Sequence, residues 1–200
     1  ERFFPRPFDE NLLKKLNLQK PVLVYSGQLE VASYAEQAVE VLKRVRQRFH
    51  TASLLILGGG RKLEAIRQRA EELYVSKNVV LTDYIPGDSI PLYLSIADIA
   101  LAPFENNNVT RAKSPLKIAE YMAMGLPIVA SDVGEVNKMT VGAAATVPCG
   151  DVEEMARQVC WLLTYPGIQK SMSIAGQNQA RTLYNWNTHA DALETAYQTA

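Results

Sequence analysis

Residues 113–131 have the sequence Lys-Ser-Pro-Leu-Lys-Ile-Ala-Glu-Tyr-Met-Ala-Met-Gly-Leu-Pro-Ile-Val-Ala-Ser. This run predicts a short helix over residues 115–124, followed by a strand over residues 128–130. Gly125 can adopt the left-handed conformation that ends a helix, and Pro127 prevents the helix from resuming. The strand is apolar and partly β-branched, which is typical of a parallel sheet that is buried on both faces.

The beginning of this helix is a candidate binding site. Ser114 is a favourable N-cap residue, and Pro115 suits the first helical position because its missing N–H would have no partner there. The free N–H groups of residues 115–118 and the positive end of the helix dipole together suit a phosphate group. Glu120 lies three residues after Lys117, so we expect both side chains near one face of the helix.

The rest of the chain alternates predicted strands with predicted helices. Short apolar runs predict further strands at residues 21–27, 53–57, 79–81, 99–102 and 143–147. Helical spacing of apolar residues predicts helices at 11–18, 33–49, 61–73, 89–96, 151–163, 168–184 and 189–200. Residues 103–113 are polar and are expected to form a loop. This alternation predicts an α/β fold, a Rossmann-like parallel sheet of about six strands with helices on both faces. Ligands of such sheets bind beyond the carboxyl ends of the strands.

Charge and composition exclude several classes of protein. The 200 residues contain 21 Lys and Arg and 21 Asp and Glu, so the formal charge is zero and nothing indicates binding to nucleic acid. No apolar run approaches the ~20 residues that cross a bilayer, and none resembles a signal peptide. Cys149 and Cys160, the two cysteines, lack metal-ligand spacing, so we expect no metal site and a reducing, cytoplasmic location.

A more specific motif lies inside the first segment: Glu120-Tyr-Met-Ala-Met-Gly-Leu-Pro-Ile-Val-Ala130. It resembles the nucleotide-sugar-binding segment of retaining GT-B glycosyltransferases of the group 1 type, glycosyltransferase family 4. In that family two glutamates are separated by seven residues, and the second opens a run E-A-M-A-x-G-x-P-V-V-A. The first glutamate, which contacts the donor sugar in the family, is replaced here by Ala112, so the catalytic residue stays unassigned.

The resemblance assigns roles to the helix and to the residues before it. Glu120 is expected to accept hydrogen bonds from ribose hydroxyls, which an ionised carboxylate does well. The backbone around Ser114, Leu116 and Lys117 is expected to meet the diphosphate.

Three basic residues flank the expected anion position. Arg111, Lys113 and Lys117 either supply positive charge to the diphosphate or are solvated charges of a loop.

Two other loops are expected to contribute to the same site. In the family, the loop after the first strand reads G-R-L-x-x-x-K-G, and its Arg and Lys hold the diphosphate. Here Gly27 is kept, whereas Gln28 and Ser33 replace the Arg and the Lys. Removing such donors typically costs ~3 kcal/mol of transition-state stabilisation each. The backbone of Tyr84 and Ile85 is expected to meet the nucleotide base.

These features predict one half of a GT-B enzyme. Residues 1–20 are expected to be an interdomain linker with a short helix, and residues 21–200 the C-terminal domain that binds a nucleotide sugar. The chain does not begin with Met, so we expect an N-terminal acceptor domain outside it. That domain could also make a peripheral membrane contact.

The resemblance also implies a reaction. The full-length enzyme would transfer a sugar from a nucleoside diphosphate donor to an acceptor with retention of configuration and without a metal ion or other cofactor. The isolated domain is expected to be inactive. The base, the sugar, the acceptor and the oligomeric state stay open.

Two alternatives belong to other classes. Ala112, Gln28 and Ser33 would also suit a degenerate glycosyltransferase-like module that binds nucleotide weakly or serves as an interaction domain. A nucleotide-sugar epimerase of similar fold is the second alternative.

Overall fold

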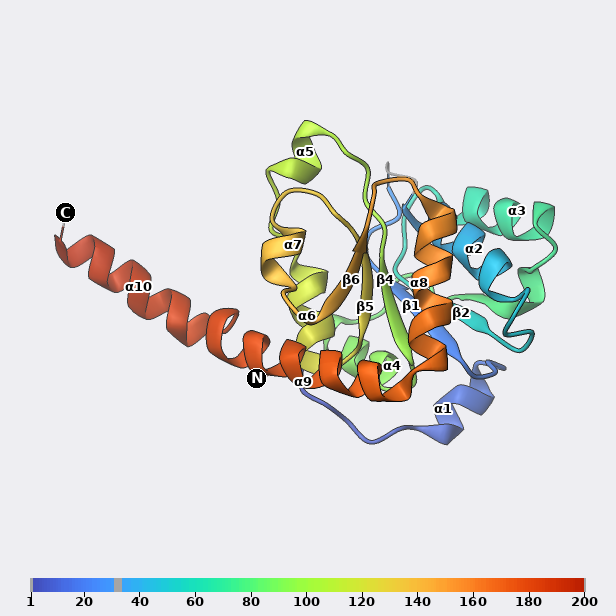
Figure 1. Cartoon of the computed structure of the whole chain (residues 1–200), viewed down its shortest axis with the longest axis horizontal. Helices are drawn as coiled ribbons and strands as arrows, with labels where there is room; N and C mark the ends of the chain where they lie inside the picture. The colour runs from blue at the N-terminus through green and yellow to red at the C-terminus, as the bar shows by residue number, and fades with distance from the viewer. Residues whose placement is uncertain (1, 31–33, 200) are drawn as a thin grey trace.

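The computed structural model describes residues 2–30 and 34–199, and Figure 1 shows their arrangement. Within these residues, six parallel strands form one sheet in the order β3-β2-β1-β4-β5-β6. The strands are β1 (Val22–Ser26), β2 (Ser53–Leu57), β3 (Val79–Leu81), β4 (Ile99–Ala102), β5 (Ile128–Ser131) and β6 (Ala144–Val147). The predicted α/β fold and the number of strands are therefore confirmed.

Helices cover both faces of the sheet. Those on one face are α2 (Tyr34–Val45), α3 (Leu63–Glu72) and α8 (Val152–Thr164). Those on the other are α1 (Glu10–Lys15), α4 (Ile90–Leu94), α6 (Leu116–Met124), α7 (Val136–Met139) and α9 (Pro166–Leu183). Shorter or peripheral elements are the 3₁₀ helices η1 (Ser76–Asn78) and η2 (Gly87–Ser89), α5 (Asn108–Arg111) and α10 (Trp186–Thr199).

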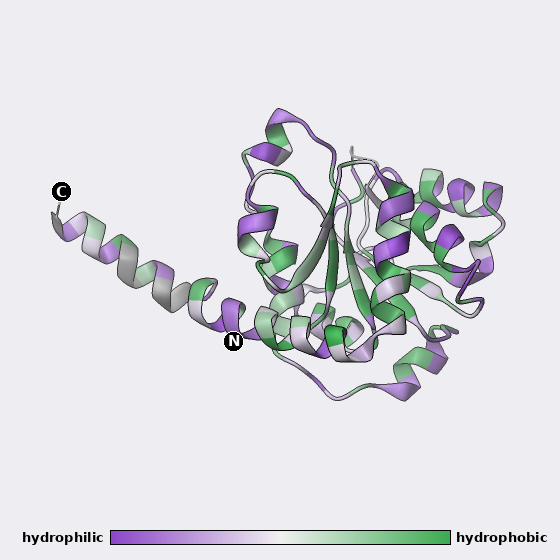
Figure 2. Ribbon diagram, in the orientation of Figure 1, coloured by the Kyte–Doolittle hydropathy of each residue, from purple (hydrophilic) through white to green (hydrophobic). Residues whose placement is uncertain are grey.

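The strands alternate between two apolar cores, one on each face. Successive side chains of a strand point to opposite faces, so Val22 and Val24 lie in one core whereas Leu23 and Tyr25 lie in the other. All residues of β1, β2, β4 and β5 are buried. Figure 2 shows the same contrast, with hydrophobic strands in the centre and hydrophilic residues on the outer sides of the helices.

The helix at the centre of the sequence motif begins one residue later than predicted. Pro115, not Ser114, is the N-cap residue, and it has extended dihedral angles and no side-chain cap. The N–H of Ile118 donates to the Pro115 carbonyl at 3.0 Å, so it is not free. The predicted stop is correct, because Gly125 is left-handed with φ 72°.

Two short helices lie where the sequence predicts none. In the expected loop, Asn107 caps α5 by accepting from the Thr110 N–H at 3.0 Å. Helix α7 follows β5. Each has four residues, too few for an apolar period to show.

Helix α10 projects away from the sheet (Figure 1). Leu193 and Tyr197 on this helix are 58% and 83% exposed. No helix of the described residues is long and apolar enough to cross a membrane.

Candidate functional site

The candidate site lies where the strand order reverses direction. β1 has β2 on one side and β4 on the other, so chain connections leave this point in opposite directions. The ladder between β1 and β4 is short, with the register pairs Leu23 to Ile99 and Val24 to Ala100. Beyond these pairs the carboxyl ends of the two strands are no longer bonded to each other. Open α/β sheets bind ligands at such a switch point.

Gly27 follows β1 directly and is tightly enclosed. Its N–H donates to the Leu57 carbonyl at 2.9 Å. A Cβ atom at Gly58, in the loop after β2, would lie 2.0 Å from the Gly27 carbonyl oxygen. A Cβ atom at Gly27 would lie 2.7 Å from Lys117 Nζ. The backbone at Gly27 is therefore pressed between the next loop and a cationic side chain of α6.

Lys117 reaches from α6 across the opening between β1 and β4. Its Nζ atom lies 4.0 Å from the ring centroid of Tyr25, whose side chain belongs to the core on the opposite face of the sheet. The ring centroid of Phe104, in the loop after β4, is 5.7 Å away. Burial lowers the pKa of Lys117 to about 7; Glu120 opposes this shift and Lys113 adds to it.

Glu120 lies on the same helix and is partly buried. Burial raises its pKa, and the positive charges of Arg2 and Lys117 act in the opposite direction. No ion pair within 4.0 Å joins Glu120 to Lys117 among the described residues. In that part of the chain, the N–H groups of Leu116 and Lys117 also have no acceptor. The N-terminal half of α6 thus offers two backbone donors and one carboxylate.

Tyr121 fixes α6 against the end of β1. It is fully buried, and its hydroxyl accepts from the Ser26 N–H at 2.6 Å. This N–H lies beyond the last residue pair that joins β1 to β4, so the hydroxyl replaces a ladder carbonyl. Burial raises the pKa of Tyr121 well above its usual value, and the phenol stays neutral.

The other predicted site residues lie more openly around this centre. Gln28, Lys113 and Ser114 are exposed. Tyr84 is 80% exposed, and its N–H donates to the Asp83 carboxylate at 2.7 Å, so this N–H is engaged within its own turn. Ile85 packs partly into the core.

Two further residues of the sequence analysis need separate mention. Ser33 lies outside the described residues. Arg111 donates through Nε to the Asn106 amide oxygen at 2.7 Å.

Sequence reasoning missed four residues of this region. Tyr25, Phe104 and Tyr121 have the spacing of core residues, and their positions beside Lys117 or Ser26 follow only from how α6 docks on the sheet. Arg2 lies far away in the sequence, yet its Nη1 is 3.4 Å from Asp88 Oδ1 in η2. The only sequence signal for Tyr25 is an aromatic residue two positions before the strand-end glycine.

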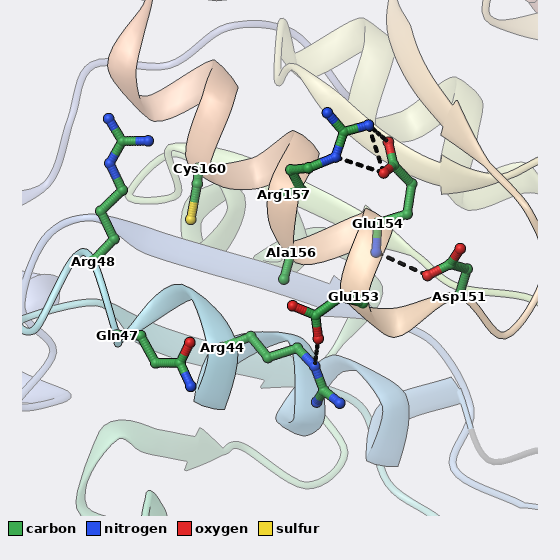
Figure 3. A pocket seen from close by; sticks show the side chains of 9 residues that line it. All are labelled: Arg44, Gln47, Arg48, Asp151, Glu153, Glu154, Ala156, Arg157 and Cys160. Atoms are coloured by element: carbon green, nitrogen blue, oxygen red, sulfur yellow. Dashed lines mark hydrogen bonds and ion pairs between the residues drawn. The ribbon is translucent and has the colours of Figure 1, made fainter.

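Two surface hollows lie beside this centre without containing it. The larger, of about 470 Å³, lies between α2 and α8 (Figure 3). Two ion pairs line it, between Arg44 and Glu153 and between Arg157 and Glu154. The smaller, of about 360 Å³, is lined by Asn106, Asp132, Thr146, Val147, Pro148 and Cys149. None of the predicted site residues that the structure describes lines either hollow.

Comparison with known proteins identifies a family that matches most of the chain. Residues 20–165 match the family described as "Glycosyl transferases group 1". Over 178 residues the chain is 29% identical to the GDP-mannose-dependent alpha-(1-6)-phosphatidylinositol monomannoside mannosyltransferase of Mycolicibacterium smegmatis, covering 87% of this chain and 47% of that protein. The chain spans about half the length of the curated relatives it matches.

Solved structures show the same fold. Sucrose-phosphate synthase from Thermosynechococcus elongatus superposes with a TM-score of 0.84 at 22% identity, covering 99% of this chain and 49% of that one. Anabaena HepE in complex with UDP superposes with a TM-score of 0.77 at 16% identity, covering 95% and 52%. The chain has the fold of one half of such proteins and, through the match over residues 20–165, belongs to the group 1 glycosyl transferase family.

Proposed function

We propose that this chain is the donor-binding domain of a retaining glycosyltransferase that moves a sugar from a nucleoside diphosphate sugar to an acceptor. The observation that carries the proposal is the position of Lys117, in the first turn of α6, beside Gly27 at the β1/β4 switch point, with Glu120 three residues further along the same helix. A carboxylate that accepts from ribose hydroxyls and free N–H groups that face a diphosphate are what a nucleotide requires there.

The relatives support the class of donor. One is named as a GDP-mannose-dependent mannosyltransferase, and the fold neighbour HepE was solved with UDP. Because the chain spans about half of these relatives, we propose that the acceptor site belongs to a second domain of the same protein. We also propose that the helix end and nearby basic side chains neutralise the diphosphate without a divalent cation, so EDTA should not change nucleotide affinity.

Calorimetric titration of the chain with UDP, GDP and ADP tests the proposal. We expect one of the three to bind, and the Glu120→Gln variant to bind it at least tenfold more weakly, because a hydrogen bond to a charged group contributes ~1.5–3 kcal/mol. Glu64→Gln is the matched control, since Glu64 is an exposed carboxylate on α3.

The outcomes separate the alternatives. If none of the three nucleotides binds at millimolar concentration, the proposal fails and the interaction-module alternative is favoured. If Glu120→Gln and Glu64→Gln bind equally, the nucleotide does not use the α6 carboxylate. In the protein with its acceptor domain, the anomeric configuration of the product, read by NMR, distinguishes a retaining from an inverting reaction.

A further inference from the structure

The structure places one basic side chain directly beside Gly27 at the candidate site. Gln28 carries no charge, Lys113 is exposed before α6, and Arg111 is bonded to the Asn106 amide. Lys117 Nζ, in contrast, is the charged atom that a Cβ at Gly27 would meet, at 2.7 Å. It therefore lies beside the strand-end backbone that a diphosphate would approach.

In the part of the chain that the structure describes, two aromatic rings and no ion-paired carboxylate surround the Lys117 amine. The rings of Tyr25 and Phe104 face its amine, and an aromatic ring stabilises a cation by ~0.5–2 kcal/mol. Among the described residues, no carboxylate lies within 4.0 Å of it. Lys62 shows the contrast, because its Nζ lies 2.9 Å from Glu36 Oε1.

The groups around Lys117 come from each element packed against it. They are Tyr25 at the end of β1, Phe104 after β4, Lys113 before α6, and Glu120 and Tyr121 on α6. Of these, Glu120 favours the charged amine and Lys113 opposes it. Tyr25 and Tyr121 stay neutral, because burial raises the pKa of both phenols. An anion that enters beside Gly27 would thus supply the negative counter-charge that is missing around the Lys117 amine.

We propose that the Lys117 amine binds the diphosphate of the donor and takes up a proton from solvent as the diphosphate enters. The proposal rests on the proposed function and deepens it. The neutral amine becomes an ammonium group by forming one N–H bond to a proton that water or buffer gives up, and no other covalent bond changes on binding. During transfer, the bond from the sugar to the diphosphate breaks and its electron pair stays on the phosphate oxygen, while the acceptor oxygen bonds the sugar carbon and gives up its proton. The ammonium group stabilises the charge that develops on the diphosphate.

Proton uptake on binding requires a lysine that is largely neutral in the free chain slightly above pH 7. Burial holds the pKa of Lys117 at about 7, and a bound anion would raise it. At a pH between the pKa of Lys117 in the free chain and its higher pKa in the complex, the complex binds more protons than the free chain. Affinity should therefore fall as the pH rises above 7, by up to tenfold per unit, and binding should take up close to one proton near pH 8. The second pKa of a phosphate monoester is about 6, so the terminal phosphate of a nucleoside diphosphate contributes little to proton uptake above pH 7.

The experiment is a calorimetric titration of the nucleotide that binds best, from pH 7 to 9, in buffers of different ionisation enthalpy. Wild-type chain should show proton uptake and falling affinity. Lys117→Met should bind at least tenfold more weakly at pH 7 and take up no proton. Lys117→Arg keeps the charge throughout and should flatten the pH profile. Lys77→Met is the control, because Lys77 is exposed and lies before the amino end of β3, an edge strand of the sheet.

Each outcome of these titrations either supports or overturns the assignment to Lys117. If Lys117→Met binds like Lys77→Met, or if wild type takes up no proton, the assignment to Lys117 is overturned while the donor-binding function stands. If wild type binds none of UDP, GDP and ADP, both proposals fall together. Circular dichroism of each variant shows that it is folded before it is titrated.

Discussion

At the scale of single residues, Lys117 lowers the stability of the folded chain while supplying the charge that we propose for diphosphate binding. A cation in apolar surroundings loses hydration, and two aromatic rings restore only part of that loss. In the folded chain this amine faces Tyr25 and Phe104. Replacing an incompletely paired, partly buried charge by an apolar side chain of similar length often stabilises a protein. Removing Lys117 should therefore improve the fold while weakening the site.

We predict that Lys117→Met raises the free energy of unfolding at pH 7 by about 1 to 3 kcal/mol. The pKa of Lys117 is about 7 in the folded chain and near 10.5 when unfolded. Between these values the unfolded chain binds more protons, so this group makes wild-type stability rise with pH, by at most about 1.4 kcal/mol per unit. Below pH 7 Lys117 is protonated in both the folded and the unfolded chain, and burying its charge lowers the free energy of unfolding by the full amount. Urea denaturation from pH 6 to 10 measures the effect.

Lys77→Met serves as the control for this prediction as well, because it removes an exposed lysine. Its stability should follow that of wild type across the whole range. Parallel curves for wild type and Lys117→Met would show that the amine has an ordinary lysine environment.

At the scale of elements, α6 is joined to β1 by a hydrogen bond that the sheet itself cannot make. The register of β1 with β4 ends at Val24, and the Tyr121 hydroxyl then accepts from the Ser26 N–H. This places the first turn of α6, with Lys117, over the end of the strand. The end of the ladder between β1 and β4 therefore both positions α6 and opens the sheet at the candidate site.

We predict that Tyr121→Phe destabilises the chain by about 1 to 3 kcal/mol, because a buried N–H loses its acceptor while the ring is kept. Tyr74→Phe removes a hydroxyl from a side chain that is 90% exposed and should change stability by less than about 0.5 kcal/mol. Denaturant unfolding of both variants measures the difference. Hydrogen exchange at Ser26 should become faster only in Tyr121→Phe, and unchanged exchange there would contradict this role of the hydroxyl.

Elements with a strong local pattern could be predicted from the sequence, and their mutual contacts could not. The strand Ser53–Leu57 has the predicted bounds because five apolar or small residues lie between polar turns. Helix α5 was missed because four residues cannot show a period, although Asn107 and Thr110 form a capping box. Glu120 followed from a motif. Tyr25 did not, because only the docking of α6 brings its ring to Lys117.

At the scale of the whole molecule, the two C-terminal helices differ in how they contact the domain. Helix α9 lies against α6, where a Cβ at Gly176 would be 3.3 Å from the Met122 Cα atom, and Ala180 is buried. Helix α10 leaves the sheet (Figure 1), and the described side chains Leu193 and Tyr197 are exposed. The compact domain therefore ends with α9.

We predict that a chain ending after Asn185 unfolds within about 2 °C of the chain ending at Ala200, because little apolar surface is lost from the core. A chain ending after Tyr165 lacks α9 and should melt far lower, since the apolar face of α6 is then exposed to water. Differential scanning calorimetry compares the three lengths. A large drop on removing α10 alone would show that this helix packs on the domain in solution.

Arg2 brings the first described residues of the chain to the rim of the candidate site. Its guanidinium contacts Asp88, and its charge acts on Glu120. A purification tag fused directly ahead of Arg2 would crowd an incoming nucleotide, whereas a tag after α10 would leave the rim open. The same proximity suits a biosensor, because an environment-sensitive dye attached at position 2 would change its fluorescence when a nucleotide arrives.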